Sequence, residues 1–458
     1  MERELKVLIL ADRHSTRLRL INLGDQAILD GLHRALRMQD GCKVASGAWK
    51  QFPYFNISRF AADCDEAAIT RVFESWYRAL GNHSDRRARL ERRIGSFLEN
   101  SPLFDNPIRR AVDRAFEQRT SLGLIEALTP YVLRNYCAHR FLEEVAAADV
   151  VLFSGSGLIA DHLAHYLPTH LFEIYAAKKL GKPVAAINQT VAVQDPLLSC
   201  IVRVIYHMVD VHAVREPISK KRLVELGIDD DDIMVVPDSA FGIADDVLQR
   251  ISAPTPAGVS EKKTVAITVR GDRSVDIDAW AKLVDYMQNK HDRRVVFLHT
   301  CRAHDLHVFR KLRQRSGIEA LDYDYDADEV CTLSAEFDFV VTDRYHAAIF
   351  AIMAGTPVVP VTSSTYKLAG LFEYFEYPLA VQPIPEIDTL PSLCQAIDQV
   401  VAQNTLCRSA IVSARSDLAM QFRLGLEEIL HRLGPLIEPP TTARPASDAG
   451  AGEPPELP

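Results

Sequence analysis

The sequence lacks a long hydrophobic run, a surplus of basic residues and a cysteine pattern typical of metal or disulfide sites. Lys and Arg total 52 against 61 Asp and Glu, so the formal net charge is -9. Proteins dedicated to nucleic acid normally have a basic surplus, and we therefore expect no nucleic-acid partner. No apolar run approaches the roughly 18 residues of a membrane span, and the N-terminal segment lacks a small-residue cleavage site. We expect a cytoplasmic protein.

Cysteine is present, but without C-x-x-C or any other ligand spacing. Scattered thiols in apolar surroundings argue against a zinc site or a disulfide framework and favour a reducing compartment. The acidic run at 229–232 lacks the spacing of a calcium loop. We therefore expect no essential metal and no cofactor. The eight cysteines are Cys42, Cys64, Cys137, Cys200, Cys301, Cys331, Cys394 and Cys407.

The composition that remains is that of a globular protein. Of the 458 residues, 48% are hydrophobic and 25% are charged, which excludes disordered and fibrous chains. At roughly 100–200 residues per domain, the length suggests two or three domains, and we expect two.

Short apolar runs that end in polar turns recur along the chain, with helix-compatible segments between them. Such runs are typical of strands buried on both faces of a parallel sheet. We therefore predict an α/β protein with two Rossmann-like domains, at 1–251 and 264–434. A Pro- and Ser-containing linker at 252–263 separates them, and a Pro-rich tail at 435–458 is predicted to be disordered. The predicted strands lie at 6–11, 149–153, 183–187, 209–214, 233–236, 264–269, 294–298, 337–342 and 357–361.

A helical insertion in the first domain is predicted at about 71–135. It contains a dense Arg cluster, at 86–93, and from 71 to 119 eleven Arg and no Lys stand against seven acidic residues. One interpretation is a solvated helical face, which is what most charge runs are. The other is a surface for an anionic acceptor or for the inner face of the cell membrane.

The residues that follow the predicted strands are the candidates for chemistry, because ligands of open α/β sheets bind at the carboxyl ends of the strands. Arg344 and His346 stand two apart where a strand gives way to a helix, a position that suits a phosphate or carboxylate. A helix cap with a salt bridge and a buried histidine explains the same spacing. Arg270 and Arg215 end two further strands, and an ion pair is an equally good explanation of Arg215. Lys367 follows another strand and is either a second cation or a surface lysine.

Two loops of the first domain are candidates for contact with a hydroxyl-rich ligand. Asn22, Gly24 and Asp25 lie in the first strand-to-helix loop, where they bind a ligand or cap the helix. Gly155, Ser156 and Gly157 follow a strand in a Ser-Gly-Ser-Gly sequence that lets a ligand approach the backbone, although a short glycine turn is also common.

The order of these motifs resembles the polysaccharide pyruvyl transferase family over most of the chain. The resemblance rests on the loop at 22–28, on the segments at 154–157, 188–191, 214–219, 226–227 and 236–241, and on the Arg-Tyr-His helix start at 344–346. It implies a GT-B-like arrangement of two domains. It also implies transfer of a pyruvyl group from phosphoenolpyruvate to two hydroxyls of a sugar or lipid-linked oligosaccharide, which forms a pyruvate ketal.

These residues are consistent with that chemistry. Phosphoenolpyruvate has a carboxylate and a phosphate, so its site needs two cationic groups, and Arg344 with Arg270 or Arg215 could supply them. His346 is our choice for acid–base catalysis, because imidazole titrates near neutral pH. Two alternatives remain: a GT-B glycosyltransferase in which Arg344 and Lys367 hold a nucleotide-sugar diphosphate, and a non-catalytic sugar-binding protein.

Overall fold

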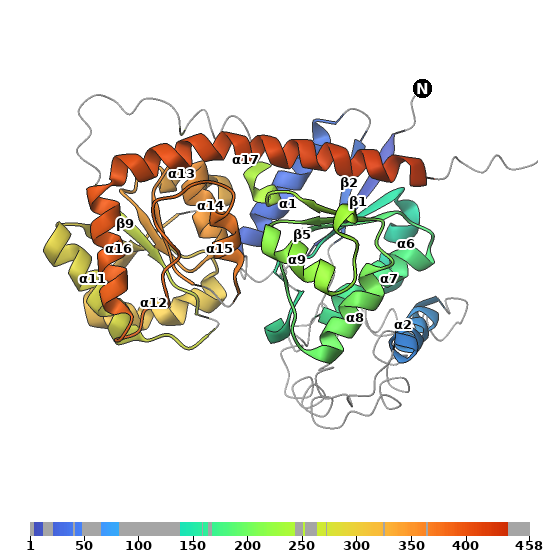
Figure 1. Ribbon diagram of the computed structural model, residues 1–458, viewed down its shortest axis with the longest axis horizontal. Helices are drawn as coiled ribbons and strands as arrows, with labels where there is room; N and C mark the ends of the chain where they lie inside the picture. The colour runs from blue at the N-terminus through green and yellow to red at the C-terminus, as the bar shows by residue number, and fades with distance from the viewer. Residues whose placement is uncertain are drawn as a thin grey trace, which may run out of the picture.

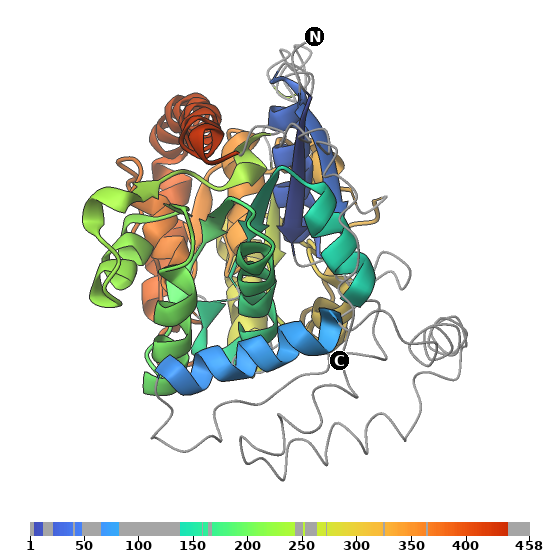
Figure 2. The ribbon, with the colours of Figure 1, turned by 90° about the vertical axis from the view of Figure 1, so that its right-hand side faces the viewer.

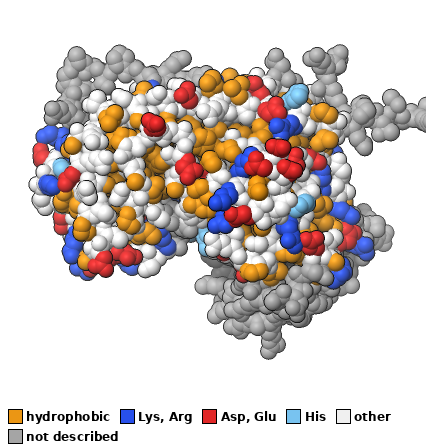
Figure 3. All heavy atoms as spheres, in the orientation of Figure 1, with side chains coloured by type: hydrophobic (Ala, Val, Ile, Leu, Met, Phe, Trp, Pro, Cys, Tyr) orange, Lys and Arg blue, Asp and Glu red, His pale blue; other side chains and the backbone are white. Residues whose placement is uncertain are grey.

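The structure of the chain is a computed structural model. It describes residues 4–11, 22–39, 42–47, 66–81, 138–157, 159–163, 167–242, 251, 263–271, 273–323, 326–362 and 365–437. Within these ranges the chain forms two α/β domains, each with a parallel sheet between two layers of helices, as expected from the apolar runs. In space-filling view the domains are two lobes (Figure 3).

The first domain contains a six-stranded sheet with the order β2-β1-β3-β5-β7-β8, and all of its paired strands are parallel. Alternate residues of β1 enter two core clusters, with Leu8 and Leu10 on one face and Val7 and Ile9 on the other. The strands are β1 (Leu5–Ala11), β2 (Cys42–Gly47), β3 (Val150–Ser154), β5 (Val184–Gln189), β7 (Val211–Val214) and β8 (Ile233–Val235).

Helices cover both faces of this sheet. One face packs against five helices, namely α2 (Glu66–Gly81), α6 (Ala138–Ala147), α7 (Leu167–Lys179), α8 (Pro196–Tyr206) and α9 (Pro217–Glu225). The other packs against α1 (Leu23–Arg37) and the end of the last long helix. Figure 2 shows α2 running crosswise beneath this domain. Shorter elements are β4 (Ile159–Ala160), which pairs with β6 (Val191–Ala192), and the 3-10 helices η4 (Asp161–Leu163), η5 (Asp230–Asp232) and η6 (Ser239–Gly242).

The second domain contains a five-stranded parallel sheet with the order β11-β10-β9-β12-β13. Its strands are β9 (Thr264–Thr268), β10 (Arg294–Phe297), β11 (Glu319–Ala320), β12 (Val340–Thr342) and β13 (Val358–Pro360). One face packs on α11 (Ile277–His291), α12 (Arg302–Ser316) and α16 (Leu390–Ala402). The other packs on α13 (Ala327–Ser334), α14 (Tyr345–Met353) and α15 (Lys367–Phe372).

Helix α17 (Asn404–Leu433) runs along both domains (Figure 1). Its first half contributes Ile411 and Leu418 to a core cluster of the second domain. Its second half contributes Phe422, Leu426 and Ile429 to a core cluster of the first. The predicted second-domain range 264–434 therefore includes a segment that packs on the first domain. A 3-10 helix, η7 (Gly434–Leu436), follows α17.

Helix α1, a helix of the first domain, also joins the two domains, because it packs into the core of the second. Leu23 and Ala27 of α1 belong to the same hydrophobic cluster as residues of the second sheet and of α14. Both amino groups of Arg34 donate to the carboxylate of Asp328 on α13, at 2.9 and 2.5 Å. Buried apolar surface and a bidentate ion pair thus hold the domains together.

Several predicted segments fall partly or wholly outside the described residues. The linker is outside except for residue 263, and of the insertion at 71–135 only 71–81 are described, as the end of α2. Of the predicted tail at 435–458, residues 435–437 are described, and Ile437 packs against the first-domain core; 438–458 lie outside the described residues. None of the helices in the described part of the chain is long and apolar enough to cross a bilayer.

Phe422→Ala should destabilise the protein by about 3–5 kcal/mol, because it opens a cavity between α17 and the first sheet. The Phe422 side chain is 2% exposed, whereas Met420 on the same helix is 53% exposed. Met420→Ala is therefore the matched control and should cost less than about 0.5 kcal/mol. Urea unfolding followed by circular dichroism measures both, and equal effects would contradict the packing of α17.

Candidate functional site

The carboxyl ends of the strands bring most of the predicted residues to the junction of the domains. The order of each sheet reverses direction beside its first strand, between β1 and β3 and between β9 and β12. Ligands of open α/β sheets bind at such points. The loop at 155–157 follows β3, Arg270 lies two residues after β9, and Arg344 lies two residues after β12.

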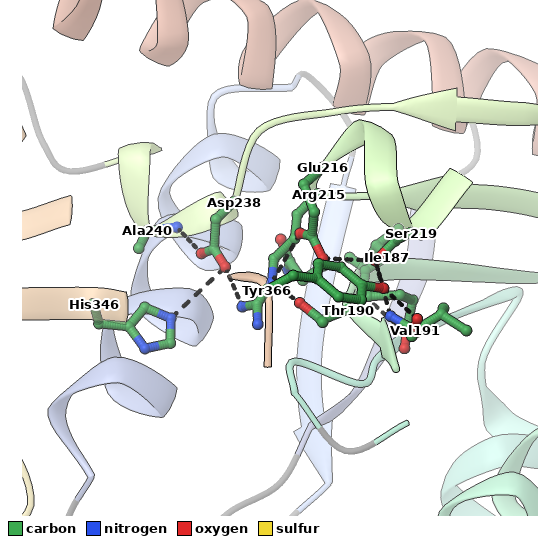
Figure 4. A network of polar contacts seen from close by, with 12 residues as sticks. Ile187, Thr190, Val191, Arg215, Glu216, Ser219, Asp238, Ala240, His346 and Tyr366 are labelled. Atoms are coloured by element: carbon green, nitrogen blue, oxygen red, sulfur yellow. Dashed lines mark hydrogen bonds and ion pairs between the residues drawn. The ribbon is translucent and has the colours of Figure 1, made fainter. Parts of the chain in front are cut away.

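His346 lies where the domains meet, and it contacts the first domain on two sides. Its side chain is 13% exposed, and its Nε2 lies 3.7 Å from Oδ2 of Asp238 (Figure 4). On another side the ring lies against Gly24 of α1, where an added Cβ would be only 1.9 Å from Nδ1. A histidine from the second domain is therefore fixed by two residues of the first, and Gly24 is required for its position.

Asp238 is the carboxylate that faces Nε2 of His346. It is fully buried just after β8, and its carboxylate accepts hydrogen bonds from Nη1 of Arg215 at 2.7 Å and from the Ala240 N–H at 2.9 Å. Burial by itself raises the pKa of Asp238, but His346, Arg215 and the Ala240 N–H together outweigh it and lower the pKa to about 2. Asp238 is therefore ionised at neutral pH.

His346 is neutral at the same pH. Burial lowers the pKa of His346 below its usual value, and the charges of Arg215 and Lys367 add to this, although Asp238 opposes it. A neutral imidazole has one N–H donor and one acceptor nitrogen. We assign the proton to Nε2, because that atom faces the Asp238 carboxylate. The acceptor is then Nδ1, so the ring is set up to receive a proton.

Arg215 is buried, which favours the structural ion pair over the substrate contact as the explanation of this residue. Its side chain is 1% exposed. Besides Asp238, its Nε donates to Oγ1 of Thr190 at 2.8 Å, and its guanidinium lies 4.2 Å from the centre of the Tyr345 ring. These contacts enclose the cation, and Arg215 holds Asp238 in place.

A polar network also fixes the start of α15. The Ser219 hydroxyl donates to Oε1 of Glu216 at 2.6 Å and lies 3.1 Å from the Tyr366 hydroxyl, which donates to the Val191 carbonyl (Figure 4). Burial raises the pKa of Glu216 to about 7, against the effect of Arg215. Lys367, the next residue after Tyr366, is thereby placed where its charge acts on His346.

Arginines surround a second buried acid, Asp343, at the end of β12. The backbone N–H of Arg270 donates to its two oxygens at 3.0 and 3.1 Å, and Nη2 of Arg273 donates to Oδ2 at 2.6 Å. Burial raises the pKa of Asp343, and Arg273, Arg344 and Arg270 all oppose this rise. The three guanidinium groups are therefore gathered in one region. Arg344 also donates to the buried carboxylate of Asp305.

The two first-domain loops have structural contacts. Oδ1 of Asn22 accepts the Gly24 N–H at 3.1 Å and caps α1, and the charge of Asp25 acts on Cys301 across the junction. A Cβ on Gly155 would lie 2.1 Å from the Gln189 side chain, so close packing requires this glycine.

The rest of the second loop lies beside Arg215. Ser156 adopts a left-handed conformation with φ of 48°. A Cβ on Gly157 would be 3.7 Å from Nη2 of Arg215. This loop therefore covers the buried cation that holds Asp238.

Asp238, Tyr345 and Arg273 are among the residues of the site that were not candidates. Each of them lies within a few residues of a strand end, so the rule that selected Arg270 and Arg344 could have selected them as well. No group of three His, Cys, Asp or Glu side chains within the described ranges is arranged to hold a metal ion.

Comparison with solved structures identifies the fold. Anabaena HepE in complex with UDP-glucose is 12% identical, the match covers 94% of this chain and 100% of that one, and the TM-score is 0.52. UDP-GlcNAc 2-epimerase from Neisseria meningitidis bound to UDP-GlcNAc is also 12% identical, over 93% of this chain and 100% of that one, with a TM-score of 0.51. The predicted GT-B-like arrangement is confirmed.

A comparison with curated proteins gives no significant match. A family model described as polysaccharide pyruvyl transferase, however, matches residues 22–365. This range begins at the residue that caps α1 and includes His346, Asp238 and the arginines around Asp343. Since the match spans more than half of the sequence and all of these groups, the chain belongs to the polysaccharide pyruvyl transferase family.

Proposed function

We propose that the protein transfers a pyruvyl group from phosphoenolpyruvate to two hydroxyls of a sugar, in a polysaccharide or its lipid-linked precursor, and forms a pyruvate ketal. Family membership supports transferase activity. The observation that supports this particular reaction is the neutral His346, held between Gly24 and an ionised Asp238 and flanked by cations.

The donor has two anionic groups, and the junction offers cations for both. Arg344 and Arg270 lie on the second-domain side around Asp343, and Lys367 lies near His346. Guanidinium forks match the geometry of carboxylate and phosphate oxygens, and an ammonium adds a point charge. In the proposal Arg344 and Arg270 hold the donor, Lys367 neutralises its second anionic group, and the buried Arg215 acts only through Asp238.

The reaction needs proton transfer in both directions. A proton adds to C3 of phosphoenolpyruvate, a sugar hydroxyl adds to C2 and loses its proton, and the C2–O bond to phosphate breaks. A second hydroxyl then adds to C2, loses its proton and closes the ketal. Of the two protons that leave the hydroxyls, one balances the proton gained at C3 and the other leaves with phosphate.

His346 performs the proton transfers in this proposal. As a neutral base it accepts a hydroxyl proton on Nδ1, and as the resulting imidazolium it returns a proton to carbon. Asp238 is a positioning residue, because it orients the ring through Nε2 and stabilises the imidazolium charge. The contact of 3.7 Å in the free protein would shorten when His346 becomes charged.

Phosphoenolpyruvate should raise the melting temperature of the protein, and UDP-glucose should not. Both ligands are tested because the solved structures of similar fold include complexes with UDP-glucose and UDP-GlcNAc. With phosphoenolpyruvate and a panel of glycosides, the wild type should release phosphate and add the mass of a pyruvate ketal to the sugar. His346→Ala should lower this rate about 10²–10⁴-fold and leave the melting shift intact.

Two results would contradict the proposal. Stabilisation by UDP-glucose alone would favour a nucleotide-sugar enzyme, and normal phosphate release by His346→Ala would remove His346 from the mechanism. His431→Ala is the matched control, because His431 is exposed in the last turn of α17.

The pH profile of kcat/KM for phosphoenolpyruvate tests the link between Asp238 and His346. Activity should fall with acid as His346 becomes protonated, with an apparent pKa below 6.5, because burial lowers the pKa of His346. The charge of Asp238 raises that pKa, so in Asp238→Asn the acidic limb should move to lower pH while the rate falls. Ionisation of phosphoenolpyruvate affects the wild type and Asp238→Asn equally, so it does not account for a difference between their profiles. An acidic limb at the same pH in both enzymes would contradict the effect of Asp238 on His346.

Gly24→Ala should lower kcat by at least about tenfold without loss of fold, because the new methyl displaces the His346 ring. The substitution itself favours a helix by about 1 kcal/mol. Gly434→Ala is the control, since no atom lies within 4 Å of its added Cβ and its φ of -50° suits alanine. Equal kcat values for Gly24→Ala and Gly434→Ala would show that Gly24 does not fix His346.

A further inference from the structure

Glu216 is a buried carboxyl group that has no part in the proton transfers of His346. Its side chain is 0% exposed. Gly370 of α15 packs directly on it, since a Cβ on Gly370 would lie only 2.6 Å from the Glu216 Cβ. Glu216 belongs to the first domain and Gly370 to the second. The junction of the domains therefore closes over this carboxyl group and keeps water from it.

The charges around Glu216 favour its neutral form. Nε of Arg215 lies 3.6 Å from Oε2 of Glu216, but this guanidinium already donates to the ionised Asp238. The charges of Arg215 and Asp238 cancel, so an ionised Glu216 would add an uncompensated negative charge to a buried cluster. Oε2 of Glu216 also has no hydrogen-bond partner in the described part of the chain. A buried carboxylate without such partners is costly, and the neutral acid is less so.

The titratable groups that face Glu216 come from both domains. Burial raises the pKa of the tyrosines among them, which are therefore neutral. Burial also raises the pKa of Glu216 to about 7, against the effects of Arg215 and Ser219. Glu216 is thus the member of this set that titrates near neutral pH. The set consists of Arg215 after β7, Asp238 after β8, Tyr345 at the start of α14, and Tyr366 and Tyr374 on either side of α15.

The hydrogen bonds of Ser219 depend on the proton of Glu216. The Ser219 hydroxyl lies 2.6 Å from Oε1 of Glu216 and 3.1 Å from the Tyr366 hydroxyl (Figure 4). It also accepts the Val191 N–H at 2.8 Å. When Glu216 is ionised, Ser219 gives its single hydrogen to the carboxylate, and Tyr366 gives its own to a backbone carbonyl. No hydrogen is then left for the contact between Ser219 and Tyr366.

A proton on Glu216 completes this chain of hydrogen bonds. Glu216 then donates to Ser219, and Ser219 donates to Tyr366. Tyr366 in turn donates to the Val191 carbonyl, so each contact between two oxygens contains one hydrogen. The chain begins and ends in the first domain and passes through a residue of the second. It therefore holds the start of α15 against the first domain, and Lys367 is the first residue of α15.

We propose that Glu216 is a positioning residue, which donates a hydrogen bond to Ser219 and thereby fixes Lys367 for binding of the anionic donor. This inference rests on the proposed function, because it assigns one anionic group of phosphoenolpyruvate to Lys367. Loss of the proton turns the Ser219 hydroxyl towards the carboxylate and releases Tyr366. Binding of phosphoenolpyruvate therefore weakens as Glu216 ionises.

Calorimetry with phosphoenolpyruvate and the full-length protein tests this role at about pH 6 and about pH 8, one unit on either side of the pKa of about 7. Glu216→Gln does not ionise, and its amide N–H still donates to Ser219. At the lower pH the wild type and Glu216→Gln should have equal Kd values. At the higher pH the wild-type Kd should be about tenfold larger, because about a tenth of the molecules keep the proton. Ionisation of phosphoenolpyruvate affects both proteins equally and cancels in this ratio.

Two tyrosine variants test whether the effect passes through Tyr366. Tyr366→Phe removes the hydroxyl that contacts Ser219. Its Kd should be at least about tenfold that of Glu216→Gln at both pH values, since the hydrogen bond is lost whatever the state of Glu216. Tyr286→Phe is the matched control, because the Tyr286 hydroxyl donates to Asp398 between α11 and α16, on the face of the second sheet away from α15. It should bind like the wild type.

Infrared difference spectra detect the proton without the donor substrate. At the lower pH the wild type should have the carbonyl band of a carboxylic acid that Glu216→Gln lacks. Absence of this band, equal Kd values of the wild type and Glu216→Gln at both pH values, or equal effects of the two tyrosine variants would overturn the inference. Failure of the wild type to bind phosphoenolpyruvate at either pH would instead overturn the proposed function, even where the band shows that Glu216 is protonated.

Discussion

The buried ion pair between Arg215 and Asp238 is the interaction on which the site depends. Removing two charges from water is costly, and the cost is offset here only because Thr190, the Tyr345 ring and the Ala240 N–H satisfy the remaining groups. Loss of one partner would leave the other buried and uncompensated, at about 3–5 kcal/mol. The pair lies in the first domain, but Tyr345 and His346 come from the second. The charge state of the histidine therefore depends on docking of the domains.

That docking is extensive, and it explains how a single histidine can be held so closely. Helix α1 enters the core of the second domain through Leu23, and α17 enters both cores. Interfaces packed like a protein interior have few alternative arrangements, since small displacements already cost contact energy. The ring of His346 is consequently placed by the packing of whole helices, and Gly24 supplies the space that this packing leaves for it.

Much of the architecture could be predicted because strands of parallel sheets are apolar on both faces. The predicted strand at 264–269 differs from β9 by one residue, and the reading of two sheets was confirmed. The edge strand β2 was missed because its sequence, CKVASG, has no continuous apolar run. The rule that ligands bind at the carboxyl ends of the strands also selected His346 and Arg344 as candidates. It could not predict which residues these two side chains contact. Asp238 and His346 are distant in the chain, and the burial that makes Arg215 structural follows only from the assembled domains.

The course of α17 also bears on the order of events during synthesis. One face of the first sheet, which includes Val7 and Ile9, is completed by Phe422, Leu426 and Ile429. These residues leave the ribosome after almost all of both domains, so the nascent first domain exposes an apolar face while the second is still being made. Such a face is a binding surface for chaperones and a risk for aggregation. Helix α17 thus completes the core of the first domain, and the stability of that domain depends on synthesis of this helix.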